Sequence, residues 1–226
     1  LKAFSYATRY DFTSDAEALL TRLESSYLRS KNGNVGHDDI IDLAPDAISY
    51  TTVISSYARS DITGKARKAQ SILYRMIDFF KAGNTDAKPS VYTFNACLNA
   101  CAYTFDQAEK VDAFIVAVST LVLLQEYTKP DSVTYGTLLK AWCNLIPNED
   151  ERRHRIVNSV FLQCCKDGQV GSMVMQQLQY AATPELYRTL VGKDVNDDVN
   201  LSSLPWQWTR NVKERNWKLS DRIKSR

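Results

Sequence analysis

Apolar residues recur along this chain at the spacing of α-helices, and three of the apolar stripes begin with nearly the same phrase. The phrases occupy residues 44–57 (APDAISYTTVISSY), 88–101 (KPSVYTFNACLNAC) and 129–142 (KPDSVTYGTLLKAW). In each, an aromatic residue is followed by apolar residues three, four and seven positions later, which is one face of an amphipathic helix. The proline before the aromatic marks the end of the previous element. Each phrase therefore predicts a helix that starts just after its proline.

A second helix is predicted after each phrase. The stripe after the first phrase consists of Ala69, Ile72, Leu73, Met76 and Phe80. The stripe after the second consists of Val111, Phe114, Ile115, Val118 and Val122. A weaker stripe after the third consists of Ile156, Val160 and Cys164. We expect all three to face the core.

A further stripe near the N-terminus has the spacing of the one that follows the first phrase. Its residues are Ala16, Leu19, Leu20, Leu23 and Tyr27. Ser14 and Glu17 have the spacing of a capping box, and Asn32-Gly33 supplies a stop signal. This stripe predicts the second helix of a unit whose first helix is not present.

The three phrases repeat at a nearly constant interval. Their prolines, Pro45, Pro89 and Pro130, lie 44 and then 41 residues apart. Periods in this range indicate stacked helical hairpins, each of which buries its apolar face against its neighbours. We therefore expect an all-α fold, an α-solenoid of helix-turn-helix repeats over residues 1–192 with about four to five hairpins, the first truncated. Residues 193–226 are expected to form an irregular tail that caps the last hairpin and carries basic charge.

Composition and charge narrow the setting. With 44% hydrophobic and 24% charged residues the chain is typical of a soluble globular protein, and its longest apolar run, near residues 113–124, is too short to cross a bilayer. Five cysteines, an odd number without framework spacing, indicate a reducing compartment. The net charge of +2 conceals a basic tail, because residues 210–226 hold seven basic and two acidic side chains. Since the first residue is Leu1 rather than Met, we expect a truncated or processed chain whose targeting segment is not visible.

The phrases resemble the pentatricopeptide repeat. Residues 132–139 (SVTYGTLL) and 91–98 (VYTFNACL) come close to the Val-Thr-Tyr-Asn-Thr-Leu-Ile run of that family, which follows a Lys-Pro-Asp. The resemblance covers residues 44–168 well and extends more weakly to 14–46 and 170–192. It implies a right-handed α-solenoid that binds single-stranded RNA inside an organelle, a mitochondrion or plastid, with one base per repeat. It implies no catalysis and no cofactor.

The resemblance also implies which side chains face the bases: in the family these are the residue after the aromatic and the last residue of the same unit. That rule pairs Asn95 with Asp131, which looks like a uracil reader of the family. It pairs Thr51 with Ser90 in the first unit and leaves the third unit without a side chain, because Gly136 stands there. The residues that would wedge between neighbouring bases, two positions before each aromatic, are Ile48, Tyr92 and Val133.

The basic tail interleaves tryptophans with cations, a combination that can stack bases and neutralise phosphates. We expect Arg210, Lys213 and Arg215 to contact RNA or an acidic partner surface. An α-solenoid must also cover its last apolar face. We expect Trp206 and Trp208 to form that cap.

No other residue pattern indicates chemistry. Cys97 and Cys101, four apart on a predicted helix, could ligate a metal, but both fall on the packing stripe and are interpreted as core residues. Asp194, Asp197 and Asp198 follow the last predicted helix as a polar loop would. The sequence has no Ser/His/Asp pairing and no glycine-rich phosphate loop. It therefore predicts no enzyme, and no site for a metal, a cofactor or a small-molecule substrate.

Two functions stay open on this sequence. The first is an RNA-binding adaptor in organellar RNA metabolism, which holds a short uracil-containing strand and makes no bonds. The second is a structural scaffold subunit of a large organellar assembly, such as a ribosome, that contacts protein or ribosomal RNA. An RNA reader should show several code pairs and a basic groove, whereas this chain has one good pair and keeps its positive charge in the tail.

Overall fold

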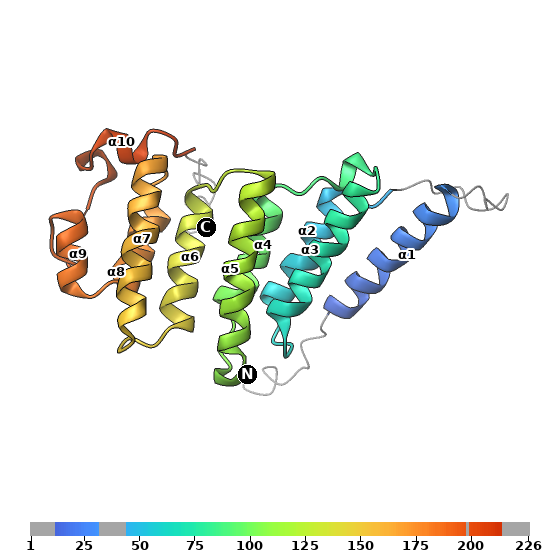
Figure 1. Cartoon of the computed structure of the whole chain (residues 1–226), viewed down its shortest axis with the longest axis horizontal. Coiled ribbons are helices and arrows are strands. Elements are labelled where there is room, and N and C mark those ends of the chain that lie inside the picture. The colour runs from blue at the N-terminus through green and yellow to red at the C-terminus, as the bar shows by residue number, and fades with distance from the viewer. Residues whose placement is uncertain (1–11, 32–43, 198, 214–226) are drawn as a thin grey trace, which may run out of the picture.

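Every regular element in the described part of the chain is a helix. The computed structural model describes residues 12–31, 44–197 and 199–213, and the helices follow one another along the longest axis of the molecule (Figure 1). They are α1 (Thr13–Lys31), α2 (Ala47–Arg59), α3 (Lys65–Lys81), α4 (Val91–Ala102), α5 (Lys110–Tyr127), α6 (Ser132–Leu145), α7 (Glu151–Asp167), α8 (Ser172–Ala181), α9 (Pro184–Val191) and the single turn α10 (Trp206–Thr209). Short 3-10 turns lie at Thr85–Ala87, Gln107–Glu109 and Leu201–Ser203. The predicted all-α character is confirmed.

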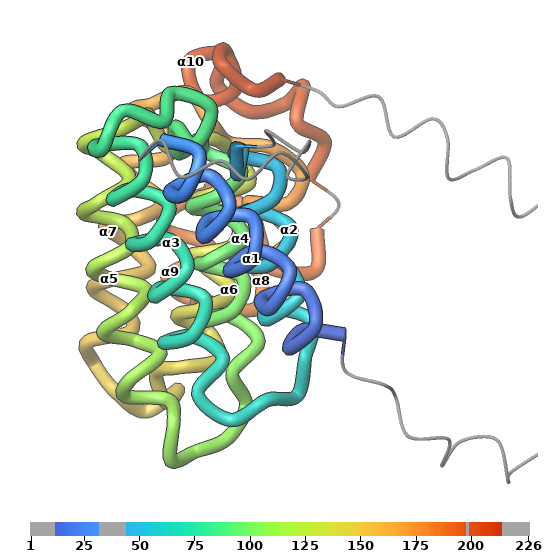
Figure 2. Tube along the Cα trace, turned by 90° about the vertical axis from the view of Figure 1, so that its right-hand side faces the viewer, coloured from blue at the N-terminus to red at the C-terminus, as the bar shows by residue number. Residues whose placement is uncertain are grey.

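The helices pack in two rows. Helices α2, α4, α6 and α8 each contact the next member of the first row. Helices α3, α5 and α7 pack against the first row from one side. Figure 2, which is turned by 90° from Figure 1, separates α5 and α7 on one side from α2 on the other. From α1 to α9, helices that are neighbours in the chain are thus also neighbours in space, whereas α10 contacts α7.

Side-chain caps fix where two first-row helices begin. Oδ1 of Asp46 accepts a hydrogen bond from the backbone N–H of Ser49 at 2.8 Å. Oδ1 of Asp131 accepts from the N–H of Thr134 at the same distance. Each carboxylate satisfies a backbone donor that has no partner within its helix. The starts of α2 and α6 are therefore set by bonds that span three residues.

The repeated apolar positions form the core, as predicted. The aromatics that open the phrases, Tyr50, Phe94 and Tyr135, are all buried. The positions three, four and seven residues later are buried as well: Val53, Ile54, Tyr57, Cys97, Leu98, Cys101, Leu138, Leu139 and Trp142. Between the rows, the rings of Phe114 and Trp142 lie 5.0 Å apart. The three phrases therefore supply equivalent buried positions in α2, α4 and α6.

Helix α5 departs from the prediction. Four of the five residues predicted to face the core lie on the outer surface with exposed fractions between 40% and 72%: Val111, Ile115, Val118 and Val122. The core side carries smaller residues instead: Ala113, Val116, Ala117 and Thr120, together with Leu124. Because α5 is apolar almost all round, its pattern alone does not fix which side is buried.

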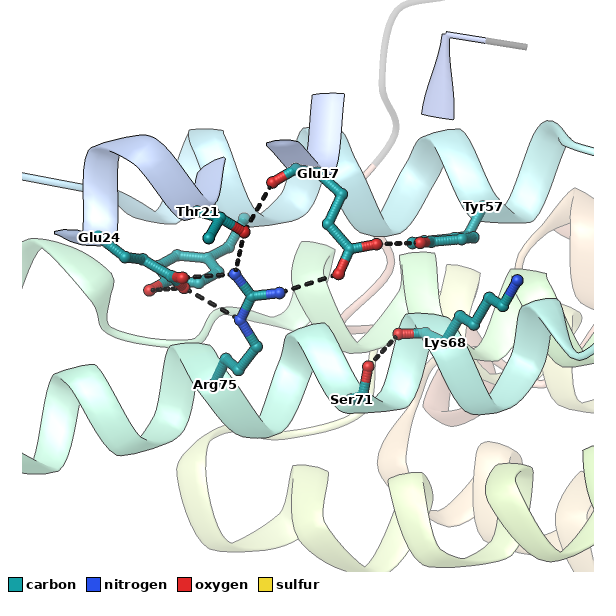
Figure 3. A network of polar contacts seen from close by, with 8 residues as sticks. Glu17, Thr21, Glu24, Tyr57, Lys68, Ser71 and Arg75 are labelled. Carbon is teal, nitrogen blue, oxygen red and sulfur yellow. Dashed lines mark hydrogen bonds and ion pairs between the residues drawn. The ribbon is translucent and has the colours of Figure 1, made fainter. Parts of the chain in front are cut away.

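A polar network holds α1 against α2 and α3 (Figure 3). The guanidinium of Arg75 on α3 forms ion pairs with Glu17, at 3.0 Å, and with Glu24. It also donates to the hydroxyl of Thr21 at 3.0 Å. From α2, the hydroxyl of Tyr50 donates to Oε1 of Glu24 at 2.9 Å. Three helices therefore meet on two carboxylates.

The network also explains why the predicted capping box is wrong. Helix α1 begins at Thr13, so Ser14 lies inside the helix and not before it. The carboxylate of Glu17 accepts from Arg75 and from the hydroxyl of Tyr57. A side chain used between helices cannot also turn back to cap its own helix.

The last described residues cover the end of α7. The ring of Trp208 lies nearly perpendicular to that of Phe161, with 5.7 Å between the centroids. The backbone N–H of Val170 donates to the carbonyl of Trp208 at 2.8 Å. Of the two tryptophans predicted to form the cap, Trp208 packs against α7, whereas Trp206 is 68% exposed. Residues two apart on a helical turn point in different directions, so only one of the two can face α7.

Candidate nucleic-acid interface

The predicted base-facing residues lie near the starts of the first-row helices. Ser90 and Asp131 are the N-cap residues of α4 and α6. Thr51 and Asn95 lie in the second turn of α2 and α4. Because these helices pack side by side, residues from successive units meet along the edge of the row where the helices begin.

Asn95 and Asp131 meet directly. Nδ2 of Asn95 donates to Oδ1 of Asp131 at 3.0 Å, across the contact between α4 and α6. Oδ1 of Asn95 accepts from the hydroxyl of Thr134 at 2.7 Å. Asn95 is only 5% exposed. The pair implied by the resemblance is thus brought together, with its amide already bonded inside the protein.

The same arrangement recurs one unit earlier. Oγ1 of Thr51 lies 2.9 Å from Oγ1 of Thr93, which lies 3.3 Å from Oγ of Ser90. In both units a buried threonine links the two residues that the resemblance pairs. Sequence reasoning missed Thr93 and Thr134. The signal was present, because a hydroxyl residue precedes the aromatic in all three phrases, with Ser49 in the first.

Two of the predicted wedge residues, Tyr92 and Val133, line a small hollow over α2, α4 and α6, and Ile48 does not. Tyr92 is 56% exposed, Ile48 is more exposed still, and Val133 is half-buried. The hollow has a volume of about 260 Å³. Its lining residues are Thr51, Ser55, Tyr92, Asn95, Ala96, Asn99 and Val133. An aromatic face beside hydroxyl and amide groups can accept one planar ring and hydrogen-bond its edge.

A larger groove continues from this hollow. It has a volume of about 1230 Å³ and shares three lining residues with the hollow: Ser55, Ala96 and Asn99. Its further lining includes cations and aromatics, namely Arg59, Lys65, Tyr103 and Phe105. The ammonium of Lys140 on α6 lies 3.7 Å from the centre of the Tyr103 ring. We call the hollow and the groove together the inner channel.

The two cations that line the inner channel differ in what they can offer a ligand. Nζ of Lys65 donates to the carbonyl of Ser60 at 3.1 Å, and burial lowers the pKa of Lys65. Arg59 is exposed and makes no ion pair with any residue in the described ranges. Asp61 also lines the groove. Of these two lining cations, Arg59 is therefore the one that is exposed and without an ion pair to any described residue, and Lys140 lies beside the Tyr103 ring.

Gly136 has a packing role. A Cβ at this position would lie 2.7 Å from Cγ of Met173 on α8. A glycine therefore allows α8 to pack closely against α6, and Met173 fills the space where a base-facing side chain would stand. The lack of a reader in the third unit has a structural reason.

The predicted tail residues are divided by the structure. The guanidinium of Arg210 donates to the carbonyl of Lys166 at 2.6 Å, so it covers the end of α7. Lys213 is exposed. Arg215 lies outside the described residues. Arg210 and Lys213 lie beyond α10, and neither lines the inner channel.

Other candidate chemistry has a structural explanation. Cys97 and Cys101 are buried, and burial raises the pKa of Cys97 to about 12, so its thiol stays protonated. In the loop after α9, Asp194 forms an ion pair with Arg188. Across residues 12–31, 44–197 and 199–213, no three His, Cys, Asp or Glu side chains gather as metal ligands would. Within the same ranges no helix has the length and apolar character needed to cross a bilayer.

Comparisons with models of known protein families, with curated proteins and with solved structures found no match to this chain.

Proposed function

We propose that this chain is a right-handed α-solenoid of pentatricopeptide type that binds single-stranded RNA as a non-catalytic adaptor in organellar RNA metabolism. The inner channel carries this proposal. It combines an exposed aromatic, hydroxyl and amide groups and an unpaired cation on two consecutive repeat units. These are the groups that hold an unpaired strand: aromatic faces stack bases and cations neutralise phosphates.

In this proposal the strand lies across α2 and α4. A base stacks on Tyr92, and its edge meets Thr51 and Asn99 in the hollow. Arg59 neutralises a phosphate further along the channel, and Tyr103 offers a second stacking face. The strand is held and positioned, and no bond is made or broken.

Tyr92 gives the sharpest test. Its ring is largely exposed, so Tyr92→Ala leaves the core intact, whereas replacing Asp131 would also remove the N-cap of α6. Stacking on an aromatic contributes about 1–3 kcal/mol per base, which predicts affinity for a uracil-rich single strand that is lower by about 5- to 150-fold. The measurement is filter binding with the full chain. The matched control is Tyr180→Ala, an exposed tyrosine on α8 that does not line the channel.

Arg59→Gln tests the electrostatic part separately. Loss of one phosphate contact should reduce the slope of log affinity against log salt by about one. Equal affinity and equal salt dependence for wild type, Tyr92→Ala and Arg59→Gln would overturn the assignment of the channel.

One observation favours the second candidate, a scaffold subunit of a large organellar assembly. The amide of Asn95 is bonded to Asp131 and Thr134 and is buried, so it is less suited to read a base. A scaffold would hold a protein segment in the same channel. Crosslinking of the intact protein in cells, with sequencing of attached RNA and identification of attached proteins, separates the two functions.

A further inference from the structure

Three polar side chains lie one helical turn beyond the positions that the resemblance assigns to the bases. Those assigned positions are Thr51 on α2, Asn95 on α4 and Gly136 on α6. A residue four positions further along lies on the same face of each helix, because four residues complete about one turn. The three residues found there, which we call the polar ladder, are Ser55, Asn99 and Lys140.

The polar ladder differs from the assigned positions in what it leaves for a ligand. Oγ1 of Thr51 lies 2.9 Å from Oγ1 of Thr93, and both ends of the Asn95 amide are bonded within the protein. The side chains of Ser55 and Asn99 are half-buried and make no hydrogen bond to any residue that the structure describes. A hydroxyl and an amide without protein partners are therefore available one turn beyond two groups that are already bonded.

Ser55 and Asn99 lie where the hollow and the groove of the inner channel join. The lining residues that the hollow and the groove share are these two and Ala96, which offers only a methyl group. Tyr92 lines the hollow and Arg59 lines the groove. A strand that stacks on Tyr92 and meets Arg59 with a phosphate therefore crosses the junction, where the edge of a base meets the Asn99 amide.

The Asn99 amide can distinguish one base from another. It offers one donor group and one acceptor side by side, and a bidentate contact of this kind discriminates between bases by about 5- to 150-fold. The hydroxyl of Ser55 donates or accepts and adds a contact from α2. Lys140 contributes in another way, because its ammonium lies 3.7 Å from the centre of the Tyr103 ring and supplies positive charge beside the channel. Base selection therefore rests on Asn99, with support from Ser55.

We propose that Asn99, together with Ser55, reads the base that occupies the junction of the inner channel. This inference rests on the proposed function, because it assigns base specificity to the strand that the channel holds. Asn95 and Asp131, the pair implied by the resemblance, bond to each other at 3.0 Å and join α4 to α6 without selecting a base. The ligand is a single strand with one preferred base, and that preference changes with the chemistry of the side chain at position 99.

Asn99→Asp gives the sharpest test, because it replaces a donor and an acceptor with acceptors alone. Cytosine carries an amino donor where uracil carries a carbonyl acceptor, and a carboxylate accepts from the cytosine amino group. Fluorescence anisotropy of the full chain with cytidine and uridine strands of equal length should show the ratio of cytidine to uridine affinity rise by about fivefold or more over wild type. The matched control is Asn158→Asp on α7, which adds the same charge at a half-buried asparagine that does not line the channel and should leave the ratio unchanged.

Two further variants separate the possible readers. Asn99→Ala adds no charge and should reduce the spread in affinity among adenosine, cytidine and uridine strands by about fivefold or more. Asp131→Asn alters the pair implied by the resemblance and keeps a residue type that caps α6, so it should leave the spread within about twofold of wild type. Unchanged thermal unfolding of each variant checks the fold.

The outcomes distinguish this inference from the proposed function. A cytidine-to-uridine ratio that Asn99→Asp leaves unchanged, a spread that survives Asn99→Ala, or a spread that Asp131→Asn reduces as far would each overturn the reading by Asn99. The proposed function would still stand in those cases if Tyr92→Ala weakens binding. A wild-type chain that binds none of the strands would overturn both.

Discussion

The two terminal segments of the described chain are attached to the helices by different physical means. At the N-terminal end, Arg75 holds α1 through the carboxylates of Glu17 and Glu24. At the C-terminal end, Trp208 covers Phe161, and backbone bonds tie the tail to the turn after α7. The first closure depends on full charges held partly out of water. The second depends on apolar contact and on hydrogen bonds to backbone carbonyls, which come from backbone amides and from the guanidinium of Arg210.

The charged closure is specific and sensitive to the loss of one partner. Glu24 is 7% exposed and accepts from both Arg75 and Tyr50. A buried ion pair adds little net stability, yet removal of one partner leaves the other charge without compensation. The network therefore fixes where α1 sits more than it adds to the free energy of unfolding.

The apolar closure completes the bonding of α7. The last carbonyls of a helix have no partner within it. Here the tail supplies donors to these carbonyls: the guanidinium of Arg210 donates to the carbonyl of Lys166, and Nδ2 of Asn211 donates to that of Asp167 at 2.8 Å. Gly168, in the left-handed conformation with φ 68°, ends the helix, and its carbonyl accepts from the N–H of Asn211 at 2.9 Å.

The largest effect is expected from Glu24→Ala at the charged end. The substitution leaves Arg75 and the Tyr50 hydroxyl without their shared acceptor. Because Arg75 is partly exposed, the loss of unfolding free energy is expected near the lower end of the range for broken buried pairs, about 3 kcal/mol. Urea unfolding measures it. The matched control is Asp15→Ala, which removes an exposed carboxylate from the same helix, and equal losses in the two variants would contradict the role of the network.

Trp208→Ala should have the next largest effect, at the apolar end. The ring is half-buried, so the loss is expected below that of a fully buried tryptophan, about 2 kcal/mol. Trp206→Ala, which removes the exposed tryptophan two positions earlier, should stay within about 0.5 kcal/mol of wild type. Urea unfolding of both variants measures the difference. If Trp206→Ala costs as much as Trp208→Ala, the tail is held in another way.

The helices and their core could be predicted because one phrase recurs three times. Tyr50, Phe94 and Tyr135 are buried as their spacing requires. The buried side of α5 could not be predicted, since this helix is apolar on both sides and only contact with α4 decides between them. The capping role predicted for Glu17 was wrong for a similar reason: its partner, Arg75, lies 58 residues further along the chain, and a local pattern does not show that contact.

The candidate site was predictable in position but not in bonding. The resemblance pairs Asn95 with Asp131, and the two side chains meet at 3.0 Å. It does not reveal that Thr134 bonds both, or that Met173 fills the space beside Gly136. Those facts depend on how closely α8 approaches α6 and α6 approaches α4. The residue pattern along the sequence does not specify these distances between helices.

Tyr50→Phe should have a smaller effect and should change the response to alkali. Burial, and then Glu24, raise the pKa of Tyr50 above its ordinary value, so the hydroxyl stays protonated in the folded chain. Its stabilising contribution is complete below the unfolded-state pKa of about 10 and is lost as the pH rises above it. At pH 7 the variant should lose about 1 kcal/mol, one hydrogen bond. Phenylalanine fits this packing position, since Phe94 occupies it in the next unit.

Urea unfolding between pH 7 and pH 11 measures the alkaline response of Tyr50→Phe. Above pH 10 its stability should fall less steeply than that of wild type, by about 1.4 kcal/mol per pH unit. Tyr135→Phe provides the comparison, because burial and Asp167 raise the pKa of Tyr135 in the same direction. An alkaline slope that Tyr50→Phe leaves unchanged would show that the Tyr50 hydroxyl ionises freely in the folded chain.

Salt should produce the smallest difference between the two ends, and the one that bears most directly on their chemistry. Raising ionic strength from about 0.1 to 1 M shortens the screening length from about 10 to 3 Å, which weakens partly exposed ion pairs such as that of Arg75 with Glu17. The opening free energy of α1, measured by amide hydrogen exchange, should therefore fall by a few tenths of a kcal/mol. The amides of Val170 and Asn211 bond to backbone carbonyls at the other end. Their opening free energies should stay the same or rise slightly, because salt does not weaken apolar burial. Equal salt sensitivity at both ends would mean that apolar contacts, and not the carboxylates, hold α1 in place.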